Sequence, residues 1–345
     1  MNAKLRAMHC RLLIPDLFPP DPAFAGPLAR QRYPHLETLI ARGRRHAIEW
    51  HSPEQWLLEA FSVERQVDWP SAPFALLGEG GEPGESYWVH ADPVHLRADR
   101  DRVLLADSSL LEIGIEEARS FADTLNAHFA PGMRFEPIAP GRWYASLAAP
   151  PQQPTQPLAA VVGRSIEAGS ASIGWHTLMN EIQMLLHAHP ANEAREARGA
   201  PAVNGLWLWG GGRLAAASSP LRGVLSRHPL ALGLAASAGV RGTYPPEDVA
   251  RWLQGGEPEG VHLAVLDRLS LPARHGALER WSEELQRLER DWFAPLHLAL
   301  QRGTIGMVSL HLGSESELLT AEATRADLRH FWRPRRPIAR YRADQ

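Results

Sequence analysis

The 345-residue chain has a single cysteine, Cys10. A disulfide within the chain is therefore impossible, and a zinc site or iron–sulfur cluster built on several thiolates is strongly disfavoured. Long apolar runs are also missing: the longest weakly polar stretch, 229–240, is about a dozen residues, against the roughly 20 that span a bilayer. The amino-terminal segment has no apolar core of signal-peptide length. These absences predict a cytoplasmic protein that does not associate with membranes.

Neither sign of charge dominates. The chain has 36 Lys and Arg against 39 Asp and Glu, which gives a formal net charge of −3 and a pI near 6.6. Nothing therefore draws the whole chain toward nucleic acid, and nucleic acid is the least favoured partner unless a local patch exists. Nucleophile elbows of the GxSxG type, phosphate loops ending in GK[ST], HExxH and CxxC are all absent.

With 44% hydrophobic residues, the chain is long enough to bury a large core. Its second half alternates strand and helix patterns, which is typical of α/β proteins. We expect a largely parallel sheet with helices on both faces, plus a smaller α+β subdomain. The predicted strands are 203–209, 230–236, 261–266 and 305–312, and the predicted helices are 175–187, 246–254 and 276–302.

Four segments describe the expected organisation. Residues 1–85 form the first part of the α/β core, and 86–150 form the smaller α+β subdomain, which contains a hairpin. The polyproline-prone run PPQQPTQP makes 151–157 a linker. Residues 158–345 complete the core and end in a basic tail.

The segment from His187 to Gly212 joins a polar, Arg-bearing turn to a short apolar strand that ends in three glycines. Open α/β sheets build ligand sites at strand ends, where guanidinium and backbone N–H groups can hold an anion. A polar loop whose glycines only turn the chain is the alternative. The predicted anion-binding residues are Asn192, Arg195, Arg198, Asn204, Gly210, Gly211 and Gly212.

Histidines and carboxylates that suit a divalent ion such as Mn, Zn or Co occur in three places. Asp16 follows a predicted strand, a position that a turn-forming aspartate can also take. His90, Asp92 and His95 lie within six residues, where a surface turn with solvated or capping histidines is the more ordinary explanation. Asp267, His275 and His311 could form a second cluster, although the apolar context of His311 is that of a core residue.

The end of the chain, RADLRHFWRPRRPIARYRADQ, interleaves arginines with aromatic residues. That composition is found in strips that stack bases and bind phosphates. A terminal segment folded back over the body of the protein is the more ordinary explanation, and we favour it.

Several motifs together resemble a known family. HPANEAREARGAPAVNGLWLWGGG looks like the segment that leads into a glycine-rich turn in archaeal-type cofactor-independent phosphoglycerate mutases, of the alkaline phosphatase superfamily. Taken over most of its length, the chain more closely resembles the RpfE-type regulatory proteins, which are phosphoglycerate-mutase-like. The supporting stretches are WVHADPVHL around His90, EEA at 116–118, LN at 125–126, GRWY at 141–144 and FWR at 331–333.

The resemblance implies an alkaline-phosphatase-type α/β core with two divalent metal ions and a phosphate-accepting Ser or Thr. Asp16 matches the first carboxylate ligand, Asp267 and His275 loosely match a later pair, and His311 falls near a final Asp-His pair. Leu310 stands where the carboxylate of that final pair belongs, and no nucleophile motif follows Asp16. Two adjacent divalent ions need several anionic ligands, so these losses weaken the metal pair.

The sequence therefore predicts a catalytically degenerate protein with a regulatory or binding role, and no catalytic residue is assigned. Its partner is a small phosphorylated or carboxylated ligand, or another protein. The alternative is an active metal-dependent phosphomutase or phosphatase with an unusual ligand set.

Overall fold

A computed structural model describes residues 8–99, 102–162, 165–166, 173–255 and 259–342. The chain forms two compact units. Unit 1 combines residues 1–57 with 218–345, and unit 2 comprises 58–217. Within the described residues, no helix combines the length and the apolar character that crossing a membrane requires.

Unit 1 is built on a seven-stranded sheet in the order β10-β9-β11-β1-β12-β13-β2. The first five of these strands pair in parallel, and β13 and β2 add an antiparallel edge. The strands are β1 (His9–Ile14), β2 (Arg44–Glu49), β9 (Leu221–Leu225), β10 (Arg241–Thr243), β11 (Val261–Val265), β12 (Met307–Gly313) and β13 (Glu317–Thr324). The largely parallel sheet that the alternating pattern predicts is confirmed.

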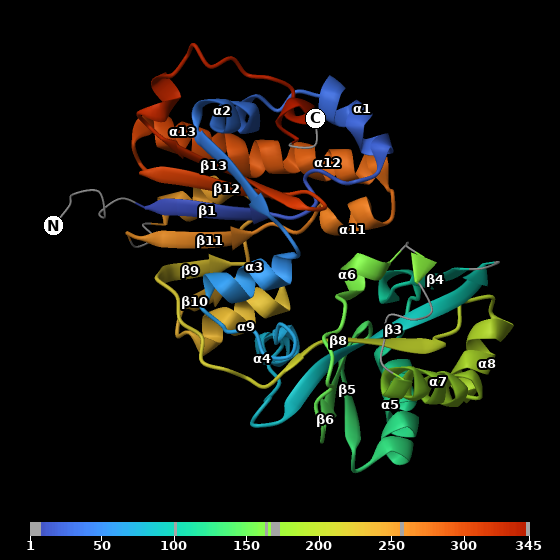
Figure 1. The fold of residues 1–345 in the computed structure, drawn as a ribbon. Coiled ribbons are helices and arrows are strands. Elements are labelled where there is room, and N and C mark those ends of the chain that lie inside the picture. The colour runs from blue at the N-terminus through green and yellow to red at the C-terminus, as the bar shows by residue number, and fades with distance from the viewer. Residues whose placement is uncertain (1–7, 100–101, 163–164, 167–172, 256–258, 343–345) are drawn as a thin grey trace. The chain divides into compact units, whose positions relative to one another are not determined.

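Helices cover both faces of this sheet: Figure 1 shows α2 (Pro34–Arg42), α12 (Leu278–Leu288) and α13 (Ala294–Arg302) on one face and α9 (Pro229–Ser237) on the other. Cys10, Leu12 and Ile14 occupy alternate positions along β1. They pack with residues of α2, α12 and α13 in one hydrophobic core. Other α-helices that belong to unit 1, wholly or in part, are α1 (Ala25–Arg30), α3 (Pro53–Ala60), α10 (Val249–Gln254) and α11 (Ser270–Arg274).

The predicted long helix over 276–302 is present as α12 and α13, joined by a π-helical turn at Glu289–Phe293. The predicted strand over 230–236 is wrong, because these residues form α9. Pro229 occupies the first turn of α9, and this helix is buried almost all round, so its apolar run carries no helical period.

Unit 2 is an α+β unit in which every strand pairing is antiparallel. Its six-stranded sheet runs β5-β6-β3-β4-β7, and β8 pairs with β3. The strands are β3 (Tyr87–Asp99), β4 (Arg102–Ala106), β5 (Met133–Ala139), β6 (Arg142–Leu147), β7 (Ser165–Ile166) and β8 (Gly205–Gly212). The helices are α4 (Ser71–Gly78), α5 (Ile115–Phe129), α6 (Leu158–Val161), α7 (Ile173–His187) and α8 (Pro190–Ala197).

The smaller α+β part therefore exists but is larger than the segment 86–150 that we expected. Residues 151–157 lie inside unit 2 and do not separate two units. The cause is long-range pairing: β8 hydrogen-bonds along β3, and residues of α7 and β8 share one core with Phe121 and Trp143. Proline content alone carries no information on such pairing.

Gly43, at the carboxyl end of α2, tests the packing of that helix against the sheet. A Cβ there would lie 2.7 Å from the carbonyl oxygen of Leu39 and 2.8 Å from that of Glu322, and these backbone atoms cannot move aside easily. We expect Gly43→Ala to lower the free energy of unfolding by about 1–3 kcal/mol. Urea denaturation followed by circular dichroism measures the change.

Gly26 supplies the matched control. It lies within α1, and a Cβ there would meet no atom within 4 Å. Gly26→Ala should leave stability unchanged or raise it by up to about 1 kcal/mol. Equal effects of the two substitutions would contradict the packing described for α2.

Candidate functional site

Asp16 stands just past the carboxyl end of β1, the strand between β11 and β12 in the sheet. Its φ of +57° is left-handed, which few residues other than glycine adopt without strain. The ends of the parallel strands β1 and β11 meet at this edge of the sheet, so Asp267 also lies there. This edge is where open α/β sheets bind ligands.

Three side chains from two other elements act on the Asp16 carboxyl group: Ser270 by a hydrogen bond, and Arg274 and Glu54 through their charges. Burial raises the pKa of Asp16 above its ordinary value, and the charge of Glu54 adds to that rise. A hydrogen bond with the Ser270 hydroxyl and the positive charge of Arg274 oppose it. Within the described part of the chain, Oε2 of Glu54 is buried with no hydrogen-bond partner. The site thus gathers two carboxyl groups, one hydroxyl and one guanidinium.

The backbone of Asp16 is anchored separately, because the indole Nε1 of Trp281 donates to its carbonyl oxygen at 3.1 Å. Trp281 is fully buried in α12. The backbone of Asp16 is therefore fixed to the core, and its carboxyl group is hydrogen-bonded to Ser270 of α11.

The other predicted metal ligands of unit 1 have different surroundings. His311 lies in β12 opposite Leu13, with its Nδ1 3.2 Å from the Thr320 hydroxyl and its ring 4.9 Å from that of Trp56. Burial lowers the pKa of His311 to about 3, so the imidazole is neutral near pH 7. His275 ends α11, where its backbone N–H donates to the carbonyl oxygen of Leu271.

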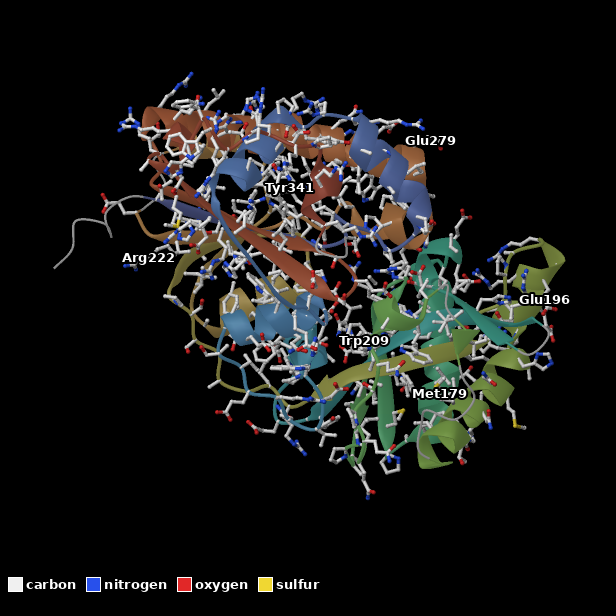
Figure 2. All side chains as sticks on the ribbon, turned by 45° about the horizontal axis from the view of Figure 1, so that its top comes forward. Met179, Glu196, Trp209, Arg222, Glu279 and Tyr341 are labelled. Carbon is white, nitrogen blue, oxygen red and sulfur yellow. The ribbon has the colours of Figure 1, made fainter. Side chains whose placement is uncertain are left out.

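The predicted ligands of unit 2 pack on aromatic and backbone groups. Asp92 accepts a hydrogen bond from the indole of Trp209 at 2.6 Å, and His90 stacks on that indole with ring centroids 4.2 Å apart. Figure 2 labels Trp209 on β8. Nδ1 of His95 lies 2.8 Å from the carbonyl oxygen of Ala202.

The described residues do not fit a metal centre. Among them, no three His, Cys, Asp or Glu side chains come close enough together to hold an ion. At Asp16, a hydroxyl and a guanidinium stand where a pair of divalent ions would need further anionic ligands. The groups that act on Asp16 among the described residues are a hydroxyl, a guanidinium and a second carboxyl group.

The predicted anion-binding side chains are engaged within unit 2. The guanidinium of Arg195 is fully buried and donates to Glu117 at 2.7 Å, to the carbonyl of Pro201 at 2.7 Å and to the carbonyl of Leu111. Arg198 pairs with the same Glu117 at 3.1 Å. A fully buried guanidinium offers nothing to a ligand in solution.

The two predicted asparagines bind backbone. Asn192 donates to the carbonyls of Leu186 and Val203 and accepts from the N–H of Val203. Asn204 bonds both backbone groups of Leu96. These hydrogen bonds connect backbone segments of unit 2, so both asparagines have a structural role.

The three glycines lie within strand β8, against neighbouring side chains. A Cβ at Gly210 or Gly212 would collide with Ser71 or Pro70, and one at Gly211 would come within 2.6 Å of the Tyr87 hydroxyl. The glycines allow the segment around 70 and β3 to approach β8. The sequence identified these positions, but not this reason for them.

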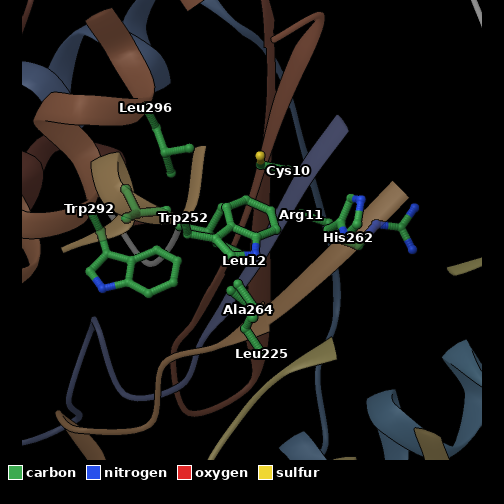
Figure 3. Close-up of a pocket in the computed structure, with 10 residues that line it drawn as sticks. Cys10, Arg11, Leu12, Leu225, Trp252, His262, Ala264, Trp292 and Leu296 are labelled. Carbon is green, nitrogen blue, oxygen red and sulfur yellow. The ribbon is translucent and has the colours of Figure 1, made fainter. Parts of the chain in front are cut away.

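Figure 3 shows a cavity between the sheet of unit 1 and its helices, lined by residues that include Leu12, Trp252, His262 and Trp292. Its volume of about 10 Å³ is room for one water molecule at most. This cavity is part of the core, and the edge of the sheet at Asp16 remains the candidate functional site.

Asp16 is a candidate residue in the sequence, whereas Glu54, Ser270 and Arg274 were not predicted. Asp16 follows a recognisable strand, whereas the other three come from α3 and α11, which only the tertiary fold brings beside it. The position of Ser270 just after the predicted strand 261–266 was the one available signal.

The fold is shared with a solved structure. The PH0037 protein from Pyrococcus horikoshii matches with a TM-score of 0.57 over 93% of this chain and 88% of its own, at 13% sequence identity. A cofactor-independent phosphoglycerate mutase from Thermoplasma acidophilum matches over 92% of this chain and 90% of its own, with a TM-score of 0.45 and 14% identity. No protein-family model and no curated protein matches in sequence.

The raised pKa of Asp16 predicts a specific pH dependence. Protonation stabilises the folded state, so this stabilisation is complete below the ordinary pKa of 3.8 and is lost as pH rises through the higher folded value. Asp16→Asn keeps a partner for Ser270, tolerates the left-handed backbone and does not titrate. Wild type should therefore lose stability relative to Asp16→Asn as pH rises.

Urea unfolding of both proteins at several pH values measures this difference. Asp21→Asn is the control, because Asp21 is an exposed aspartate that caps a short 3₁₀ helix in the same unit. A difference between wild type and Asp16→Asn that stays constant with pH would contradict the buried carboxyl group.

The two arginines on Glu117 give a matched pair in unit 2. Arg195→Ala should destabilise the protein by about 3–5 kcal/mol, because it removes the buried partner of Glu117 and the donors to the carbonyls of Leu111 and Pro201, and Arg198 replaces only the first. Arg198→Ala should cost less than about 1 kcal/mol, since that guanidinium is half exposed. Thermal and urea unfolding check both values, and similar costs would contradict the structural role of Arg195.

Proposed function

We propose that this chain is a phosphoglycerate-mutase-like protein that binds a small phosphorylated or carboxylated ligand without converting it, and so serves a regulatory role. The observation that carries the proposal is the set of groups around Asp16. A hydroxyl from Ser270 and a guanidinium from Arg274 stand beside this carboxyl group. The sequence motifs that resemble RpfE-type regulatory proteins support the same reading.

The chemistry of these groups suits binding better than turnover. The planar guanidinium of Arg274 can make paired hydrogen bonds to a phosphate or carboxylate. Asp16, with its raised pKa, can bind a proton and donate it in a hydrogen bond to the same anion, which removes a repulsive charge. Phosphoryl transfer also needs cations that stabilise charge in the transition state and a group that accepts the phosphate.

Ligand binding is tested by calorimetry with 3-phosphoglycerate as the probe. We expect Arg274→Ala to weaken binding about ten- to a hundredfold, the usual effect of removing a charged hydrogen bond. Arg268→Ala is the control: this arginine lies six positions earlier, is exposed, and faces Glu284 at 3.9 Å. Equal losses in the two variants would remove the assignment of Arg274.

Turnover is tested on the same protein after equilibration with Mn, Zn or Co and desalting. We expect no tightly bound metal and no conversion of phosphoglycerates or release of phosphate. Two ions per chain, together with turnover that Asp16→Ala abolishes, would instead establish the alternative, an active metal-dependent phosphomutase or phosphatase.

A further inference from the structure

Unit 1 contains an open groove of about 820 Å³ between the edge strand β2 and the chain's carboxyl-terminal segment. We call it the basic groove. Five arginines line it: Arg44, Arg45, Arg333, Arg336 and Arg340. None of the residues around Asp16 lines the groove, so a ligand bound in it is independent of the function proposed for the Asp16 edge.

The terminal segment folds back onto unit 1, as the sequence analysis favoured. Leu328, Ile338 and Tyr341 are buried in the main core of that unit. Between these anchors, the arginines and aromatic residues at 331–336 remain largely exposed. Folding back has therefore arranged the basic residues along a groove without burying them.

Protein contacts fix the positions of the groove's walls. The guanidinium of Arg45 lies 5.2 Å from the centre of the Tyr341 ring, which Figure 2 labels. Arg333 donates to the carbonyl oxygens of Arg42 and Gly43, at 3.1 and 3.3 Å. The backbone N–H of Arg336 donates to the Tyr341 hydroxyl at 3.2 Å. The two walls are thus joined before any ligand arrives.

The positive charge of the groove is largely uncompensated. Arg44 forms an ion pair with Glu322 at 3.2 Å. Among the described carboxylates, none lies within ion-pair distance of Arg45, Arg333, Arg336 or Arg340. The groove is therefore a local basic patch on a chain whose net charge is −3. Such a patch attracts a chain of negative charges.

Aromatic rings stand beside these cations. Trp332 lines the groove and is 64% exposed, and the adjoining Phe331 is 78% exposed. Their ring centroids are 5.4 Å apart and nearly perpendicular, and the His330 ring lies 4.9 Å from that of Trp332, so a base can stack only on the part of the indole that stays exposed. Exposed aromatic faces next to arginines are the combination that stacks nucleobases while phosphates are neutralised.

We propose that the basic groove binds single-stranded nucleic acid, with its arginines on successive phosphates and Trp332 stacked on a base. A single strand fits better than a duplex because stacking on a side chain requires an unpaired base. The several separated arginines in an open groove suit a chain of phosphates better than one small anion.

The test measures fluorescence anisotropy of a labelled oligouridine of about twelve nucleotides with the full chain, over a series of salt concentrations. We expect saturable binding that weakens with salt. The double variant Arg336→Ala/Arg340→Ala should lower the slope of log affinity against log salt by about 1.4, since each phosphate contact on a single strand contributes about 0.7. Trp332→Ala should weaken binding about tenfold.

Arg251→Ala is the matched control, since it removes an exposed arginine on α10 that does not line the groove. Its affinity should equal that of wild type. Inorganic polyphosphate and polyglutamate serve as competitors without bases, and both should displace the labelled oligonucleotide less effectively than unlabelled oligouridine at matched charge concentration. No saturable binding, an equal loss in Arg251→Ala, or full competition together with an unchanged Trp332→Ala would each overturn the proposal.

Discussion

The parallel pairing of β1 on both of its edges is the constraint on which unit 1 depends. Leu13 stands level with Val265 on one side and with His311 on the other. With both edges paired, the alternation along β1 sends Cys10, Leu12 and Ile14 into the helical core. The same pairing fixes where β1 ends, and therefore brings Asp16 to the sheet edge that Asp267 also occupies.

In unit 2, the constraint is the hydrogen bonding of backbone that belongs to neither helix nor strand. Residues 198–204 connect α8 to β8, and the backbone groups of the buried Val203 in this connection need partners. Arg195 and Asn192 supply such partners at Pro201 and Val203. Arginine and asparagine beside a glycine-rich strand suggested a ligand site because the same donors serve ligands and backbone alike. Burial distinguishes the two uses, and a single sequence does not reveal burial.

The sequence predicted those helices and strands in which buried residues recur at a regular spacing. The helix predicted over 276–302 contains α12, whose Trp281, Leu285 and Leu288 are buried, and the hairpin predicted within 86–150 is present as β5 and β6. β2 was not predicted, because all six of its residues are exposed and no apolar alternation remains. The strand predicted over 230–236 was wrong for the opposite reason, since α9 is apolar on all sides. Ser270 and Arg274 were missed because their proximity to Asp16 exists only in the tertiary structure.

The left-handed backbone of Asp16 has a consequence for function. Such a conformation persists only where surrounding contacts impose it, and the buried indole of Trp281 holds the Asp16 carbonyl oxygen at 3.1 Å. That hydrogen bond involves no side-chain atom of Asp16, so it holds the backbone in place whether or not the carboxyl group is ionised. Burial raises the pKa of this carboxyl group, and the charge of Arg274 opposes that rise. The proposed binding of a small anion at this edge rests on these contacts of Asp16.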